Sequence, residues 1–150
     1  MKLQIENNQN KIKIDKRIIR STVLRIMRIL NCADKEISLS FVDDEKIKKL
    51  NKEYLGKDKP TNVISFSLRE GEYSDINPQI MGDIIISVET AQRDALWGNL
   101  TVSQEIDFLI IHGILHLLGY NHENTTREET NKMRKKEKDL FTAVCGLTTV

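Results

Sequence analysis

Hydrophobic and polar residues alternate over several short segments of the chain, which is the pattern of β-strands with one buried face. Residues 3–5 and 12–14 both show this spacing, and one or both are expected to form a strand. The segments 37–42 and 63–68 alternate in the same way. Residues 82–86 form a largely apolar run that ends in three isoleucines, which predicts a strand covered on both faces.

Five other segments repeat their hydrophobic residues every three or four positions, which predicts amphipathic helices. Each begins after a residue whose side-chain oxygen can cap backbone N–H groups. The expected caps are Asp15, Asp43 or Asp44, Ser87, Thr101 and Thr126. In the second helix, Ile47, Leu50 and Tyr54 are expected to point inward. The fourth helix, after Thr101, is apolar nearly all round, so it should be central and buried.

These elements predict one α+β domain over residues 1–150, with a mixed sheet of about four strands and helices packed on it. The length of 150 residues suits one domain. No apolar run approaches the ~20 residues of a membrane span, and no signal-peptide core is present at the start. Cys32 and Cys145 lack metal-type spacing and are expected to be reduced thiols in a cytoplasmic protein.

The formal net charge of +1 conceals an uneven distribution along the chain. Residues 1–31 carry eight basic and two acidic groups, whereas residues 32–122 carry nine basic and fifteen acidic groups. Such a basic segment can attract phosphate groups, although an ordinary solvated helix face is the simpler interpretation.

The chain has three histidines, His112, His116 and His122, within one window of eleven residues. The first two are four positions apart on the predicted central helix, so their imidazoles share a face. Gly119 is expected to end the helix and let the chain return His122 to the same point. Three imidazoles predict a zinc site with an open fourth position, where a bound water can reach a pKa near ~7 and act as the nucleophile. The alternatives are three packed or solvated histidines, or a structural site closed by Glu123.

The spacing of these histidines also occurs in metzincin proteases, in which a glutamate after the first histidine is the general base. Gly113 occupies that position here and cannot accept a proton. The sequence therefore disfavours a peptide metallohydrolase. Gly113 indicates either room beside the metal or another backbone packed closely against the helix.

Three blocks of sequence resemble the YbeY-type endoribonucleases, the bacterial rRNA maturation factors. The first is HGILHLLGYNH at residues 112–122, which resembles the family signature. The second is Tyr54 followed by GKDKPTNVISF at residues 56–66, and the third is GDI at residues 82–84. The blocks follow the family's order across nearly the whole chain.

The resemblance implies a metal-dependent endoribonuclease, specific for single strands, that acts in 16S rRNA maturation and ribosome quality control. It implies His112, His116 and His122 as ligands of one Zn²⁺ ion. It also implies rRNA and the small ribosomal subunit as partners, suggests an Era-type GTPase as another, and gives no role to a membrane.

Two positions depart from the family pattern. Leu55 stands where the family has an RNA-contacting, catalytic arginine, and leucine cannot bind a phosphate. Lys57 and Lys59 are candidates to replace part of that positive charge. Asn121 stands where the family usually has aspartate. The departure at Leu55 leaves open a ribosome-assembly or RNA-binding factor whose catalysis is weakened or lost.

Further residues are candidates for supporting roles. Arg17 and Arg20 are candidates for binding the RNA backbone, together with the two lysines. Asp83 and Asn121 are candidates for orienting the metal ligands by hydrogen bonds to the histidine side chains. Glu105 and Asp107, in contrast, are expected to face solvent or form salt bridges.

Overall fold

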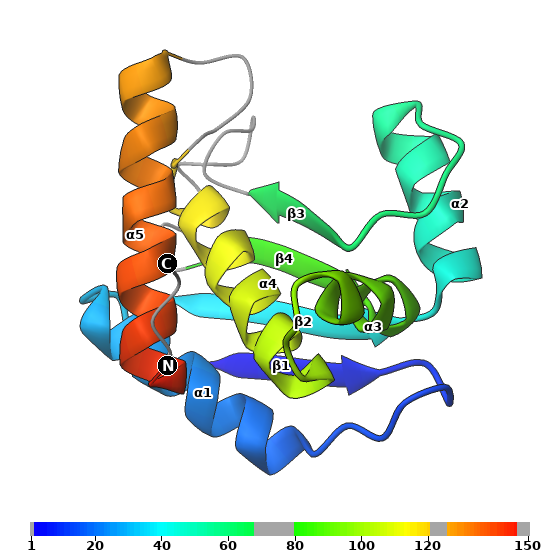
Figure 1. Ribbon diagram of the computed structural model, residues 1–150, viewed down its shortest axis with the longest axis horizontal. Coiled ribbons are helices and arrows are strands. Elements are labelled where there is room, and N and C mark those ends of the chain that lie inside the picture. The colour runs from blue at the N-terminus through cyan, green and yellow to red at the C-terminus, as the bar shows by residue number, and fades with distance from the viewer. Residues whose placement is uncertain (1, 68–79, 121–125, 147–150) are drawn as a thin grey trace.

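A four-stranded sheet forms the centre of the computed structural model, which describes residues 2–67, 80–120 and 126–146 (Figure 1). The strands follow one another across the sheet in the order β1-β2-β4-β3. β1 and β2 are parallel, β2 and β4 are parallel, and β3 is antiparallel to β4, so the sheet is mixed as predicted. The strands are β1 (Leu3–Asn7), β2 (Glu36–Val42), β3 (Val63–Ser67) and β4 (Ile80–Ser87).

The five predicted helices are all present, and each begins at an expected cap. A side-chain oxygen of Asp15, Asp43, Ser87, Thr101 or Thr126 accepts a backbone N–H of the first turn. None of the described helices is long and apolar enough to cross a membrane. The helices are α1 (Lys16–Ile29), α2 (Asp44–Leu55), α3 (Val88–Trp97), α4 (Val102–Leu117) and α5 (Arg127–Cys145).

The sheet has one thickly covered face and one thinly covered face. The large core contains buried residues of α1, α3, α4 and α5 together with Leu39, Ile84 and Ile86 of the sheet. Figure 1 shows this layer of helices, with α4 in its middle. The other face carries a small cluster in which Ile47 of α2 packs near Ile85. The prediction of a central, buried fourth helix is therefore confirmed.

Hydrogen bonds from the end of β4 and from α3 to the first residue of α2 hold that helix in place on the thinly covered face. The Asp44 carboxylate accepts hydrogen bonds from Ser87 Oγ at 2.7 Å, Thr90 Oγ1 at 2.6 Å and Arg93 at 2.7 Å. Burial alone would raise the pKa of Asp44, but these partners hold it below its usual value. α2 is thus fixed at its N-terminus, and its C-terminus leads into the turn described below.

The first half of β4 differs from its prediction. The strand begins at Ile80 rather than Gly82. Ile80 and Gly82 pair with consecutive residues of β2, so Met81 between them is an extra residue in the strand. This irregularity places Met81 and Ile84 in the same core and breaks the alternation that would mark a strand. Of the two early strand candidates, only residues 3–7 form a strand, while residues 12–14 are irregular.

Three predictions about side-chain exposure also need correction. Tyr54, near the end of α2, was expected to point inward but is 59% exposed. Its ring makes an edge-type contact with the ring of Phe66 in β3. Glu105 is 8% exposed, and burial raises its pKa, with a further increase from the charge of Asp94. The Asp107 carboxylate accepts a hydrogen bond from the Cys145 thiol at 3.5 Å, and burial raises the pKa of this carboxyl to about 6.

Gly82 lies where β4 is tightly packed against β3 and α4. Its φ of +146° is one that side-chain-bearing residues rarely adopt, and a Cβ atom there would lie 2.0 Å from the Phe66 carbonyl oxygen. Any larger residue would have to separate β3 from β4 or distort the strand.

We therefore expect Gly82→Ala to lower the free energy of unfolding by about 3 kcal/mol or more. Gly98→Ala is the matched control, because Gly98 has a φ of −86° and its Cβ atom would lie 3.4 Å from the nearest atom. The control should stay within about 1 kcal/mol of the unsubstituted protein in urea unfolding. Equal stability of the two variants would contradict this account of β4.

Candidate active site

Two of the three predicted metal ligands meet on the exposed side of α4. The Nε2 atoms of His112 and His116 are 3.0 Å apart, and their ring centroids are 4.5 Å apart. The four-residue spacing on a helix produces this convergence directly. His122 lies outside the described residues, as do Asn121 and Glu123.

A carboxylate from α5 fixes the orientation of the first histidine. Glu137 Oε1 lies 2.8 Å from His112 Nδ1, and Glu137 is only 8% exposed. A carboxylate oxygen accepts this hydrogen bond, so His112 Nδ1 is the donor, and in the neutral imidazole Nε2 is then the nitrogen with the lone pair. This is the arrangement commonly found behind metal-binding histidines.

Sequence reasoning missed Glu137, although the sequence contains a signal for it. Met133, Leu140 and Phe141 form the buried stripe of α5, and Glu137 falls within that stripe. A carboxylate is costly to bury without a partner, so its place in an apolar stripe indicates a polar partner on the facing helix. That partner is His112.

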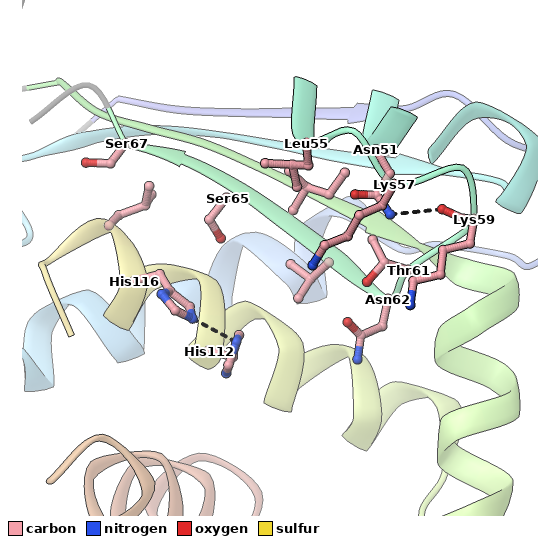
Figure 2. A pocket seen from close by; sticks show the side chains of 13 residues that line it. Asn51, Leu55, Lys57, Lys59, Thr61, Asn62, Ser65, Ser67, His112 and His116 are labelled. Atoms are coloured by element: carbon pink, nitrogen blue, oxygen red, sulfur yellow. Dashed lines mark hydrogen bonds between the residues drawn. The ribbon is translucent and has the colours of Figure 1, made fainter. Parts of the chain in front are cut away.

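The two histidines face a cavity of about 610 Å³ between α4, β3 and the turn that follows α2 (Figure 2). Ser65 and Ser67 lie on the face of β3 opposite Ile64, which belongs to the cluster under α2. No described residue that lines the cavity is acidic. The lining consists of Asn51, Leu55, Lys57, Lys59, Thr61, Asn62, Val63, Ile64, Ser65, Ser67, His112, His116 and Leu117.

Lys57 and Lys59 lie on a turn that a buried amide holds in place. Asn51 is 2% exposed, and its Nδ2 donates to the Lys59 carbonyl at 2.9 Å (Figure 2). The Lys57 backbone N–H donates to the Asn51 carbonyl at 3.2 Å. Farther along, Asn62 Nδ2 donates to Asp94 of α3 at 3.1 Å. The backbone that carries both lysines is therefore anchored at several points, and sequence reasoning did not identify Asn51.

The structure brings together only some of the predicted site residues. Lys57 and Lys59 line the same cavity as the histidine pair, and Leu55 lies at its edge, 52% exposed. Asp83 does not join them, because it pairs with Phe66 and lies on the sheet face opposite α4. It therefore cannot orient the histidines, and Glu137 does so instead.

Arg17 and Arg20 are also remote from the cavity. Both lie on α1, and the Arg20 guanidinium donates to the Leu3 carbonyl of β1 at 3.1 Å. β1 and β3 are opposite edges of the sheet, and the cavity lies at the β3 edge. The two arginines therefore cannot contact a group that sits between His112 and Lys57.

Gly113 serves the packing of α4 and not the chemistry of the cavity. A Cβ atom at this position would lie 2.9 Å from Ile84 Cγ2, in the core between helix and sheet. A glutamate here would be directed at β4, away from the histidines. The sequence indicated room beside the metal or a closely packed backbone, but the close neighbour is a side chain of the sheet, Ile84.

The described donors fit a zinc ion. Zinc–nitrogen bonds of about 2.0–2.1 Å place two imidazole nitrogens roughly 3.3 Å apart in a tetrahedral site. The Nε2 atoms lie 3.0 Å apart, and the hydrogen bond from His112 Nδ1 to Glu137 leaves Nε2 as the nitrogen that faces the cavity. The described residues alone contain no group of three donors, since the expected third, His122, lies outside them.

Comparison with known proteins finds relatives that match nearly the whole chain. The chain is 59% identical over 146 residues to endoribonuclease YbeY of Syntrophus aciditrophicus, a match that covers 97% of this chain and 91% of that protein. It is 44% identical over 142 residues to endoribonuclease YbeY of Syntrophotalea carbinolica, covering 95% of each.

A solved structure supports the same relationship. The solution structure of a protein from Thermotoga maritima superposes with a TM-score of 0.67 at 26% identity, covering 96% of this chain and 89% of that one. The model of the family described as endoribonuclease YbeY matches residues 4–144. The extent of that match and the identity to both relatives show that this chain belongs to the endoribonuclease YbeY family.

Proposed function

We propose that this chain is a metal-dependent endoribonuclease that cleaves single-stranded RNA in 16S rRNA maturation and ribosome quality control in the cytoplasm. One observation carries the proposal. The His112 and His116 Nε2 atoms converge at the wall of a cavity whose only described charged side chains are Lys57 and Lys59. Such a cavity combines metal-binding nitrogens with cations that attract phosphate.

In this proposal, His112, His116 and His122 hold one zinc ion. Zinc supplies a Lewis acid that polarises a phosphate oxygen and lowers the pKa of water. Glu137 holds the Nδ1 proton of His112, so that its Nε2 stays available as a ligand. Removing the Glu137 charge should weaken the site without changing the ligands themselves.

The remaining cavity residues bind and orient the substrate. Lys57 and Lys59 supply positive charge for the phosphates, and Asn51 holds the turn on which both lie. Ser65 and Ser67 of β3 line the same cavity and bring hydroxyl groups to it. A cavity of about 610 Å³ is in the range that takes a small ligand, which favours unpaired nucleotides over a duplex.

The proposed setting is the small ribosomal subunit, with rRNA as substrate and an Era-type GTPase as a partner. These assignments rest on the family to which the chain belongs. A peptide metallohydrolase is disfavoured further by Gly113, whose missing Cβ would point at Ile84 and away from the cavity.

A second candidate function is ribosome assembly or RNA binding with weakened or lost catalysis. Leu55 at the cavity edge favours it, because a leucine cannot stabilise the negative charge that develops on a phosphate during cleavage. Lysines replace the charge of an arginine but not its planar pair of donors.

Purified protein should cleave an unpaired rRNA-precursor segment, and a chelator should abolish the cleavage. His112→Ala should lower kcat/KM at least about 100-fold, because it removes a ligand that the proposed chemistry requires. Lys46→Ala on the exposed side of α2 is the control and should cleave at the normal rate. Cleavage that survives both the chelator and His112→Ala would overturn the metal-dependent proposal.

Glu137→Gln should lower zinc affinity by about tenfold, because it keeps the size of the side chain but removes the charge behind His112. The measurement is competition with a chromophoric chelator, with circular dichroism to confirm folding. Glu128→Gln, an exposed substitution in the first turn of the same helix, should leave zinc affinity unchanged. Equal affinities for the two variants would show that Glu137 does not support a metal ligand.

Leu55→Arg should raise kcat/KM for RNA cleavage by about tenfold or more, since it adds a planar phosphate-binding group at the cavity edge. Leu55 is half-exposed, so the longer side chain should not disturb folding. Leu96→Arg is the matched control, because Leu96 is 85% exposed on α3 and does not line the cavity. Cleavage by the variant alone would favour the second function, and an unchanged rate would show that the leucine is no defect.

A further inference from the structure

A concentrated basic surface lies on α1, away from the cavity. The helix carries five basic residues and no acidic one, and its four arginines are half of the eight in the whole chain. We call these five residues the α1 basic face. They are Lys16, Arg17, Arg20, Arg25 and Arg28.

The packing of α1 turns most of this basic face toward solvent. Ile19, Val23 and Ile26 are buried against the core, so Arg17 and Arg28 lie on the opposite side and are exposed. Arg20 lies at the flank and donates to the Leu3 carbonyl. Among the described residues, no acidic group forms a salt bridge with any member of the face.

The next helix along the chain, α2, differs in this respect. Its four lysines share the helix with three acidic residues, and Lys49 pairs with Glu45 at 3.8 Å. Nearby charges of opposite sign cancel at a distance, whereas the unopposed charges of α1 add. The α1 basic face is therefore a source of positive potential, and α2 is not.

The α1 basic face and the cavity lie at opposite edges of the sheet. α1 lies along β1, and the cavity lies beside β3, with β2 and β4 between them (Figure 1). Three strand spacings amount to about 14 Å before the side chains are added. One phosphate group therefore cannot touch both places, but a longer polyanion can.

We propose that the α1 basic face binds the phosphate backbone of the same RNA whose unpaired segment enters the cavity. The proposal rests on the RNA-cleaving function proposed above. Arginine suits this role, because its planar guanidinium binds phosphate oxygens in pairs. Arg17 and Arg28 are eleven residues apart on a helix, about 16 Å, which matches a run of several phosphates. The protein would then select an RNA by what lies beyond the unpaired segment as well as by the segment itself.

The test replaces Lys16, Arg17 and Arg28 by glutamine in one triple variant. It leaves Arg20, which bonds to β1, and Arg25, whose charge acts on Cys145. Affinity is measured by fluorescence anisotropy with a chelator present, so that no RNA is cleaved. On an rRNA-precursor fragment of about 30 nucleotides, affinity should fall at least tenfold and the salt slope by about 2–3, whereas an oligomer of about four nucleotides should lose little affinity.

The matched control is Lys46, Lys48 and Lys49 replaced by glutamine, three exposed lysines on the mixed-charge α2. It removes the same net charge and should change the long-RNA affinity much less. Equal losses in the two triple variants, or no loss in the α1 variant, would overturn the proposal. Polyglutamate is tested in the same way. If the unsubstituted protein binds it as tightly as RNA and the α1 variant does not bind it, the proposal is overturned in favour of an acidic protein partner.

This experiment separates the two proposals because it measures binding without cleavage. If the α1 variant binds long RNA weakly while the unsubstituted protein shows no nuclease activity, only the cleavage proposal fails. If the unsubstituted protein cleaves RNA but the α1 variant keeps its affinity and salt slope, only the α1 proposal fails.

Discussion

The close packing of α4 against β4 is the contact on which the rest of the structure depends. Gly113 lets the helix approach until Ile84 fills the place of its missing side chain, and Gly82 lies near Leu117 in the same way. A helix seated so deeply on the sheet is buried on most of its surface. The side that remains carries His112 and His116, so the packing that builds the core also decides where imidazoles are presented.

A helix held this firmly still needs a second element to orient its histidines, and α5 provides it. The cost of burying the Glu137 carboxylate is offset by its hydrogen bond to His112, so a charged group remains in an otherwise apolar interface. The opposite wall is arranged by the same means, since the buried amide of Asn51 holds the turn that carries Lys57 and Lys59. Both supports are buried polar groups, and each makes a hydrogen bond to a residue that lines the cavity.

Local chemistry made much of this predictable from the sequence. Helix caps and the period of hydrophobic residues depend on neighbours a few positions away, and all five helices begin where their caps predicted. The failures involve distant partners. Met81 is an extra residue only in relation to the pairing of β4 with β2, which the sequence does not show. Whether Asp83 can reach the histidines depends on which face of the sheet α4 covers. Glu137 lies 25 positions from His112, so no spacing rule joins them, whereas the four-residue step to His116 placed two imidazoles together.

The distribution of arginine and lysine bears on how a substrate would be oriented. The described cavity residues include two lysines and no arginine, while four arginines lie on α1. A lysine acts as a mobile point charge and attracts a phosphate without fixing its direction. Direction must then come from Ser65, Ser67 and the two histidines within the cavity, or from contacts outside it. Leu55 supplies no contact that fixes the direction of a phosphate. A distant, arginine-rich contact therefore contributes more to orienting the substrate in this chain than it would in a chain with an arginine at position 55.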